Sequence, residues 1–196
     1  MKYVIVSCSQ RQQSQSIKVA RYLEKQLDEN GHEVFLHDCG IEPLPLWGTD
    51  SADSAWAYWL QLSEALLNAE AFVLVTPEWC GMATPQSKNL FLLAGQKELG
   101  HKAGMIVSVS AGRGGAYPIA ELRSSSYKNS RINWIPEHVI VRQVESVLND
   151  EVPESISDTW IRDRIDFALT HLEIYAEALG QVRAKLPTDP RFGNGM

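Results

Sequence analysis

The sequence has few cysteines and no long apolar run, and both shortages limit where the protein can work. Its three cysteines, Cys8, Cys39 and Cys80, form no CxxC pair and no metal-binding spacing, so reduced thiols are expected. No stretch approaches about 18 consecutive apolar residues, so no membrane-spanning helix is expected. The start, MKYVIVSCSQRQ, has too short an apolar core for a secretion signal. We therefore expect a cytoplasmic protein.

Positive charge is also scarce. The chain has 18 Lys and Arg against 24 Asp and Glu, a net charge of -6, and no basic run, which argues against a nucleic-acid partner. A modest acidic balance of this size is explained by solubility alone. No Ser/His/Asp set is recognisable, and no metal site or catalytic side chain is assigned. The histidines, which show no ligand spacing, are His32, His37, His101, His138 and His171.

What the sequence does contain is a regular alternation of apolar runs and amphipathic segments. With 44% hydrophobic residues in 196, it can bury a sizeable core. Strands are predicted at residues 3–6, 33–37, 71–75, 104–109 and 137–142. Helices are predicted at 16–30, 55–69, 85–96, 115–128 and about 157–186, with a Pro/Gly/Asp-rich loop at 40–53.

The predicted strands are continuous apolar runs, which is typical of parallel strands covered on both faces. Five such strands joined through helices by right-handed crossovers form a doubly wound α/β sheet. Both common strand orders remain possible at this length. We expect the flavodoxin-like order 2-1-3-4-5, with helices on both faces and a long C-terminal helix. We expect one domain over residues 1–186 and a loosely held tail at 187–196.

The loop after the first predicted strand, residues 7–16, is dense in hydroxyls and amides and opens a helix. Ligands of such sheets bind at the carboxyl ends of the strands, where the order reverses. A helix N-terminus suits an anion, and the loop lacks GxGxxG and GxxxxGKS, so it indicates a monophosphate. The candidate ligands are Ser9, Arg11, Ser14, Gln15 and Ser16. Equally, the serines could merely cap the helix and leave Arg11 in solvent.

The loops after the third and fourth predicted strands complete the candidate site. In the first of them, Trp79 can offer an aromatic face to a flat ring, and Gly81 allows close approach of the backbone, although a tryptophan more often packs under its own loop. In the second, the glycines expose backbone N–H groups that suit an anion, or simply form a tight turn. The candidates are Pro77, Glu78, Trp79, Cys80 and Gly81 from one loop, and Ser110, Gly112, Arg113, Gly114 and Gly115 from the other.

Taken in order, these loops resemble the NADPH-dependent FMN reductase family, which includes related quinone, chromate and azo reductases. The resemblance covers about residues 1–145. The family's GSxRxxS loop reads CSQRQQSQS here, its TPEYN…P…LKN segment reads TPEWCGMATPQSKN, and its GxxGG turn reads SAGRGG. The segment LPLWGTD also looks like the family's loop after the second strand. Four positions depart from the pattern: Cys8 for Gly, Trp79 for Tyr, Cys80 for Asn, and Ser87 for Leu.

The resemblance implies an enzyme that binds FMN and oxidises NADPH or NADH. The first loop would hold the FMN phosphate, residues 78–82 would lie along the ring, and residues 110–115 would donate to its pyrimidine end. A hydride would pass from nicotinamide to FMN and on to a small-molecule acceptor such as a flavin or quinone. The alternatives are a flavodoxin-like electron carrier and a family member without activity.

The last predicted helix has more apolar surface than a five-stranded sheet needs. One stripe carries Ile161, Ile165, Leu172, Tyr175, Leu179 and Val182, while Trp160, Phe167 and Ile174 lie off it. Spare apolar surface usually marks an interface, so we expect a homodimer or homotetramer. A helix that covers the sheet and then projects is the alternative.

Overall fold

Strands and helices alternate along the chain in the computed structural model, which describes residues 1–49, 54–187 and 189–193. The five strands are β1 (Lys2–Ser7), β2 (Glu33–Asp38), β3 (Ala71–Pro77), β4 (Ala103–Val109) and β5 (Asn133–Val141). They form one parallel sheet in the order β2-β1-β3-β4-β5, which confirms the predicted flavodoxin-like topology.

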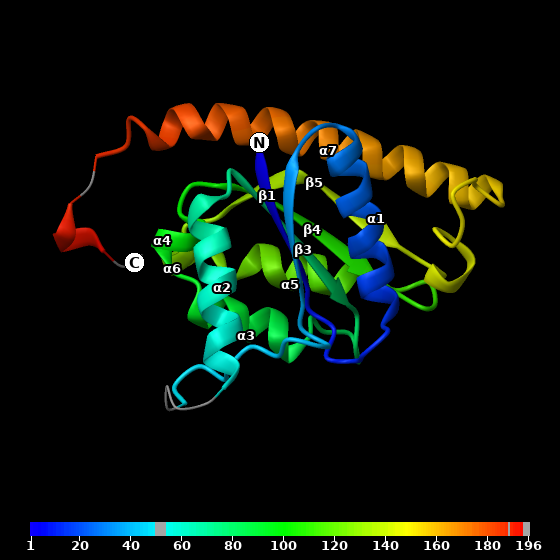
Figure 1. Cartoon of the computed structure of the whole chain (residues 1–196), viewed down its shortest axis with the longest axis horizontal. Helices are drawn as coiled ribbons and strands as arrows, with labels where there is room; N and C mark the ends of the chain where they lie inside the picture. The colour runs from blue at the N-terminus through cyan, green and yellow to red at the C-terminus, as the bar shows by residue number, and fades with distance from the viewer. Residues whose placement is uncertain (50–53, 188, 194–196) are drawn as a thin grey trace.

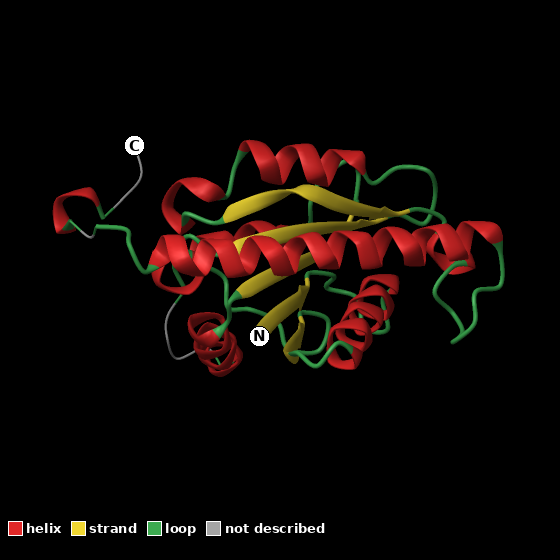
Figure 2. Cartoon of the chain, turned by 90° about the horizontal axis from the view of Figure 1, so that it is seen from above, coloured by secondary structure: helices red, strands yellow, loops and turns green. Residues whose placement is uncertain are grey.

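Helices cover both faces of this sheet (Figures 1 and 2). One core cluster joins the sheet to α1 and α7, and a second joins its other face to α2, α3 and α5. The long α7 runs along the length of the sheet in both views. The helices are α1 (Gln15–Glu29), α2 (Ala55–Asn68), α3 (Pro85–Leu93), α4 (Gln96–Leu99), α5 (Ala116–Ser124), α6 (Tyr127–Ser130) and α7 (Ile156–Arg183), with 3-10 turns η1 (Val144–Ser146) and η2 (Pro190–Phe192).

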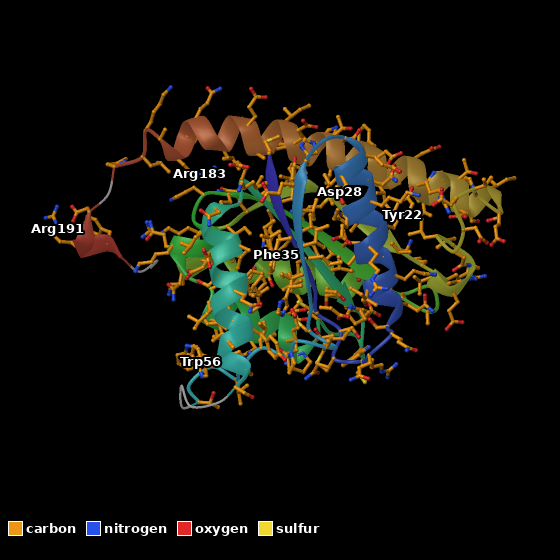
Figure 3. All side chains as sticks on the ribbon, in the orientation of Figure 1. Tyr22, Asp28, Phe35, Trp56, Arg183 and Arg191 are labelled. Carbon is orange, nitrogen blue, oxygen red and sulfur yellow. The ribbon has the colours of Figure 1, made fainter. Side chains whose placement is uncertain are left out.

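The central strands explain why the sheet is stable. Every residue of β3 and β4 is buried, as continuous apolar runs covered on both faces should be. Strand β5 lies at an edge and alternates in burial instead. Figure 3 shows Phe35, on the other edge strand β2, with its side chain in the layer that faces α2.

Several predicted boundaries were wrong. The last helix, expected to run to about residue 186, ends at Arg183. The helix expected at 85–96 ends at Leu93, because Ala94 turns extended and Gly95 is the N-cap of a separate short helix, α4. The helix expected at 115–128 divides into α5 and α6 at Ser125. The fifth strand begins at Asn133, not at 137, because an edge strand tolerates Pro136.

In the described part of the chain, none of the helices combines the length and apolarity that spanning a bilayer requires. Residues 50–53 of the predicted loop, and residues 188 and 194–196 of the predicted tail, lie outside the described residues. The described part of the tail contains η2 and lies beyond the end of α7 (Figure 1).

Candidate functional site

A pocket of about 420 Å³ opens at the carboxyl ends of the strands, the end of the sheet away from the N label in Figure 1. That volume falls within the range of small-molecule sites. Other hollows of the described chain include one of about 360 Å³ beside the edge strand β2 and one of about 640 Å³ between α1 and α7. A further one, of about 380 Å³, lies on the other side of the β1–α1 loop and shares Gln13, Ser14 and Gln15 with the 420 Å³ pocket. The lining of the 420 Å³ pocket is Ser9, Arg11, Gln12, Gln13, Ser14, Gln15, Ser16, Pro77, Glu78, Trp79, Val109, Ala111, Val144 and Glu145.

The loop between β1 and α1 forms one wall of this pocket. The Ser14 hydroxyl caps α1 by accepting the Ile17 N–H at 3.2 Å, so the expected helix cap is real at this residue. Ser9 is buried, and its hydroxyl accepts the Arg11 N–H at 3.3 Å. The first turn of α1, from Gln15, has N–H groups without intrahelical partners. Hydroxyls, free N–H groups and one guanidinium therefore converge on this wall.

The loop after β2 supports this wall from outside the pocket. A Cβ placed on Gly40 would lie 2.6 Å from the Arg11 carbonyl oxygen, so only glycine fits there without a shift of backbone. The Gly40 N–H donates to the Asp38 carboxylate at 3.0 Å, which fixes the turn.

Arg11 and Trp79 meet across the pocket. The Arg11 guanidinium carbon lies 5.0 Å from the centre of the Trp79 ring, a cation–π contact between the first and second loops. The indole is half-buried and the arginine is exposed. A flat ligand on this face of Trp79 would have to share it with the guanidinium or displace it.

Trp79 begins a tight two-residue turn. Its N–H and carbonyl both pair with Met82, at 3.0 and 2.9 Å, and Cys80 and Gly81 have φ values of 50° and 72°. Positive φ at both central residues defines a type I′ turn, for which Asn-Gly is the preferred pair. Cys80 and Gly81 thus shape the mouth of the site, and neither is among the residues that line the pocket.

Glu78 reaches to the N-terminus of α5. Its carboxylate accepts the Gly115 N–H at 2.7 Å and the Tyr117 N–H at 3.3 Å. Gly115 has φ 101° and no side chain of its own with which to cap the helix, so Glu78 supplies the cap and a charge that suits the helix dipole. The Gly115 N–H is therefore engaged inside the protein.

The third loop contributes less to the pocket than the sequence indicates. Val109 and Ala111 line it, but Ser110, Gly112, Arg113, Gly114 and Gly115 do not. Ser110 accepts the Gly112 N–H at 3.3 Å, Arg113 is exposed, and Gly114 lies against the Glu78 carboxylate. These residues surround the N-terminus of α5 beside the pocket.

A fourth wall, which the sequence analysis missed, comes from η1 after β5. Val144 and Glu145 line the pocket, and Lys18 of α1 holds this segment. Its ammonium group donates to the carbonyls of Val144 and Val147 at 2.6 and 2.9 Å, and to Asn149 at 2.8 Å. Burial lowers the pKa of Lys18. Two features of the sequence could have indicated this wall. Lys18 lies on the first turn of α1, and the strand that precedes η1, the edge strand β5, also ends at the ligand edge of the sheet.

Both members of the family-like Lys-Asn pair hold loops in position, and neither lines the pocket. Lys88 forms an ion pair with Glu121, and Glu121 also accepts the Ala83 N–H at 2.7 Å. Asn89 is buried and binds the loop after β2 at two points, 2.8 Å from Trp47 N and 2.8 Å from the Pro45 carbonyl. Both hold the rim of the site in place.

Comparison with known proteins agrees with this architecture. The model of the NADPH-dependent FMN reductase family matches residues 1–145. An NADPH azoreductase from Bacillus sp. (strain OY1-2) is 24% identical over 182 residues, which cover 93% of this chain and 98% of that protein. Among solved structures, the flavoenzyme NAD(P)H:(acceptor) oxidoreductase FerB from Paracoccus denitrificans has a TM-score of 0.65 at 19% identity, covering 92% of this chain and 97% of that one. A flavodoxin from the domain Archaea has a TM-score of 0.55 at 13% identity, covering 89% and 99%.

The fold defines a flavodoxin-like α/β protein with a pocket at the carboxyl ends of its strands, and the family match refines that class. The chain belongs to the NADPH-dependent FMN reductase family. It is an NAD(P)H-dependent oxidoreductase that uses FMN. The donor set fits this cofactor, because a helix N-terminus, hydroxyls and Arg11 suit a phosphate and Trp79 suits a flat ring.

Proposed function

We propose that the 420 Å³ pocket holds FMN with its phosphate at the N-terminus of α1. The single observation that carries this proposal is that Arg11 and Trp79, one suited to a phosphate and one to a ring, line the same pocket. The Ser9 and Ser14 hydroxyls, the first-turn N–H groups at Gln15 and Ser16, and the Arg11 guanidinium would hold the phosphate.

The other loops would orient the ring. Pro77, Glu78 and Trp79 bring one wall to the reactive face, and the Cys80-Gly81 turn fixes the direction of Trp79. Ser110, Gly112, Arg113 and Gly114, which lie beside the pocket and do not line it, would offer backbone donors and a positive charge to the pyrimidine end. Glu78 holds Gly115 and thereby the first turn of α5 in position. When bound, FMN supplies the hydride chemistry, taking the hydride from the nicotinamide and giving it to the acceptor.

The acceptor, in this proposal, is a small molecule such as a flavin or a quinone, entering the slot that the nicotinamide has left. Exposed apolar side chains at Met82 and Tyr117 stand beside the turn at Gly81, where the Tyr117 ring lies 3.8 Å from a Cβ built on that glycine. Such a rim favours flat, apolar acceptors. We propose a cytoplasmic homodimer or homotetramer as the working form.

The two alternatives, an electron carrier and an inactive family member, make different predictions for the purified protein. A reductase is yellow as purified, or stays yellow after incubation with FMN and removal of the free flavin, and it oxidises NADPH with an added acceptor. A carrier keeps FMN and does not oxidise NADPH, whereas an inactive member binds no flavin. Binding should also quench tryptophan fluorescence, because Trp79 lines the pocket. Unchanged emission at saturating FMN would contradict the contact with Trp79.

The placement of the phosphate is tested at Arg11. Because charge-assisted hydrogen bonds contribute about 1.5–3 kcal/mol, Arg11→Ala should weaken FMN roughly 10- to 150-fold in a calorimetric titration. Riboflavin, which lacks the phosphate, should lose much less affinity. Arg21→Ala, on α1 but outside this pocket, is the matched control and should change neither ligand. Equal losses for FMN and riboflavin would place the phosphate elsewhere.

A further inference from the structure

The two buried cysteines of this chain lie side by side at the ends of neighbouring strands. Cys8 directly follows β1 and Cys39 directly follows β2, and these strands pair in parallel as far as Ser7 and Asp38. The ladder continues to the cysteines, because the Cys39 N–H donates to the Ser7 carbonyl at 3.0 Å. Opposite residues of paired strands face the same side of a sheet, and both cysteines belong to the core cluster on the α2 side.

This placement meets the backbone requirement of a disulfide. Neighbouring strands lie about 4.8 Å apart, and the Cα atoms of bonded cysteines are usually about 4.4–6.8 Å apart. The backbone of Cys8 is fixed on two sides, because its N–H donates to the Val75 carbonyl at 2.8 Å and its carbonyl accepts the Thr84 hydroxyl at 2.7 Å. The two thiols also interact, since a hydrogen bond with Cys8, and then burial, raises the pKa of the Cys39 thiol. Two anchored thiols therefore already face each other.

We infer that Cys8 and Cys39 form a reversible disulfide, closed by a peroxide as small as hydrogen peroxide. The thiols are 0% and 2% exposed, so a bulky oxidant has no direct access to them. One thiol takes an oxygen atom from the peroxide and becomes a sulfenic acid, which releases one water. The other thiol attacks that sulfur, the S–S bond forms, and the oxygen leaves as a second water. The two thiols lose two electrons in all, and one peroxide becomes two waters that carry the two thiol hydrogens.

The disulfide would control the wall that holds the FMN phosphate, and this part of the inference rests on the proposed function. Cys8 directly precedes Ser9, and Cys39 directly precedes Gly40. The two loops already touch, because a Cβ on Gly40 would lie 2.6 Å from the Arg11 carbonyl oxygen. A covalent link next to this contact changes the spacing of two loops that have no room between them. The reduced pair therefore permits FMN binding, and the disulfide displaces Ser9 and Arg11 and weakens it.

Formation of the bond is tested in folded, full-length protein that carries Cys80→Ser, so that only the buried pair can react. After hydrogen peroxide treatment, neither cysteine should take up a thiol-blocking reagent in denaturant. A non-reduced digest should then join the peptide that contains Cys8 to the peptide that contains Cys39. The same treatment of Cys39→Ser in this background should give no link. Two free thiols, or sulfinic acids without a link, would overturn the inference.

Control of the phosphate wall is tested by calorimetric FMN titration of the same proteins once the peroxide is removed. Oxidation should weaken FMN at least about 10-fold, because the charge-assisted contact of Arg11 is lost, and dithiothreitol should restore the affinity. In the Cys39→Ser control, the affinity should be the same before and after peroxide. A disulfide that leaves FMN affinity unchanged would overturn the control of the wall. A reduced protein that binds no FMN would overturn the proposed function and this control, while the digest still decides whether the disulfide forms.

Discussion

At the scale of single residues, Cys80 is the point where this sequence departs from what its backbone favours. Its φ of 50° lies in the left-handed region, which costs an ordinary residue roughly 1–2 kcal/mol. Asn tolerates that region and is the preferred residue before Gly81 in a type I′ turn. We therefore expect Cys80→Asn to raise the free energy of unfolding by about 0.5–1 kcal/mol, measured by urea denaturation.

The control for this prediction is Cys80→Ala, which removes the thiol but keeps the strain. Ala should give little or no gain, and a stabilisation equal to that of Asn would show that the backbone is not the cause. Cys80→Gly should also relieve the strain in the turn. Part of that gain is offset, because glycine raises the conformational entropy of the unfolded chain.

Residue types predicted the candidate site better than they predicted what each residue does. The hydroxyl-rich loop indicated Ser9, Arg11 and Ser14, and these three residues line one pocket. The role of Glu78 was not visible, because its partners at Gly115 and Tyr117 are distant in sequence and lie within reach only once β3 and β4 pair.

At the scale of elements, α5 depends on a carboxylate from another loop. Its N-cap residue is glycine, so the helix has no local side-chain cap, and Glu78 fills that place. Helix caps and charges at helix N-termini are typically worth about 1 kcal/mol each. We expect Glu78→Ala to lower the free energy of unfolding by about 1–2 kcal/mol and Glu78→Gln to lower it by about half as much.

Glu145→Ala is the matched control for Glu78. Both carboxylates line the same pocket, but Glu145 is an exposed residue of η1. Its substitution should change the free energy of unfolding by less than about 0.5 kcal/mol. If Glu78→Ala unfolds at the same urea concentration as Glu145→Ala, the capping role is wrong.

The predicted elements were right in kind and wrong at their ends for local reasons. The helix expected to run to residue 128 stops because Ser124, Ser125 and Ser126 hydrogen bond back to the carbonyls of Glu121 and Leu122. Such bonds compete with the helical ladder. The start of β5 was missed because Pro136 indicates a break, while the sheet order makes β5 an edge, where proline costs little.

At the scale of the whole molecule, the parallel doubly wound sheet followed from alternation and handedness, which need only the sequence pattern. These left both common strand orders open, and the expected order 2-1-3-4-5 is confirmed by the structure. The wall formed by η1 did not follow, because it requires knowing that Lys18 of α1 lies under the segment after β5, more than 120 residues away. Likewise, the stripe on α7 was visible in the sequence, but only the packed structure shows which face is buried.

The stability of the whole fold should fall in weak acid because of His37. This histidine is fully covered on β2, and burial lowers its pKa to about 4, against an opposing contact with Glu42. In the unfolded chain its pKa is about 6.5. Between these values the unfolded state binds a proton that the folded state does not. The titration of His37 therefore leaves the free energy of unfolding at its full value above about pH 6.5 and lowers it as the pH falls towards 4.

We expect this histidine to remove on the order of 2–3 kcal/mol from the free energy of unfolding between pH 7 and about pH 4. The measurement is urea denaturation across that range for wild type and His37→Gln. The difference between the two curves isolates His37, because the carboxylates titrate in both. Burial also lowers the pKa of His101 and His138, so some slope should survive in the variant. Parallel curves for the two proteins would mean that His37 is protonated as readily in the fold as outside it.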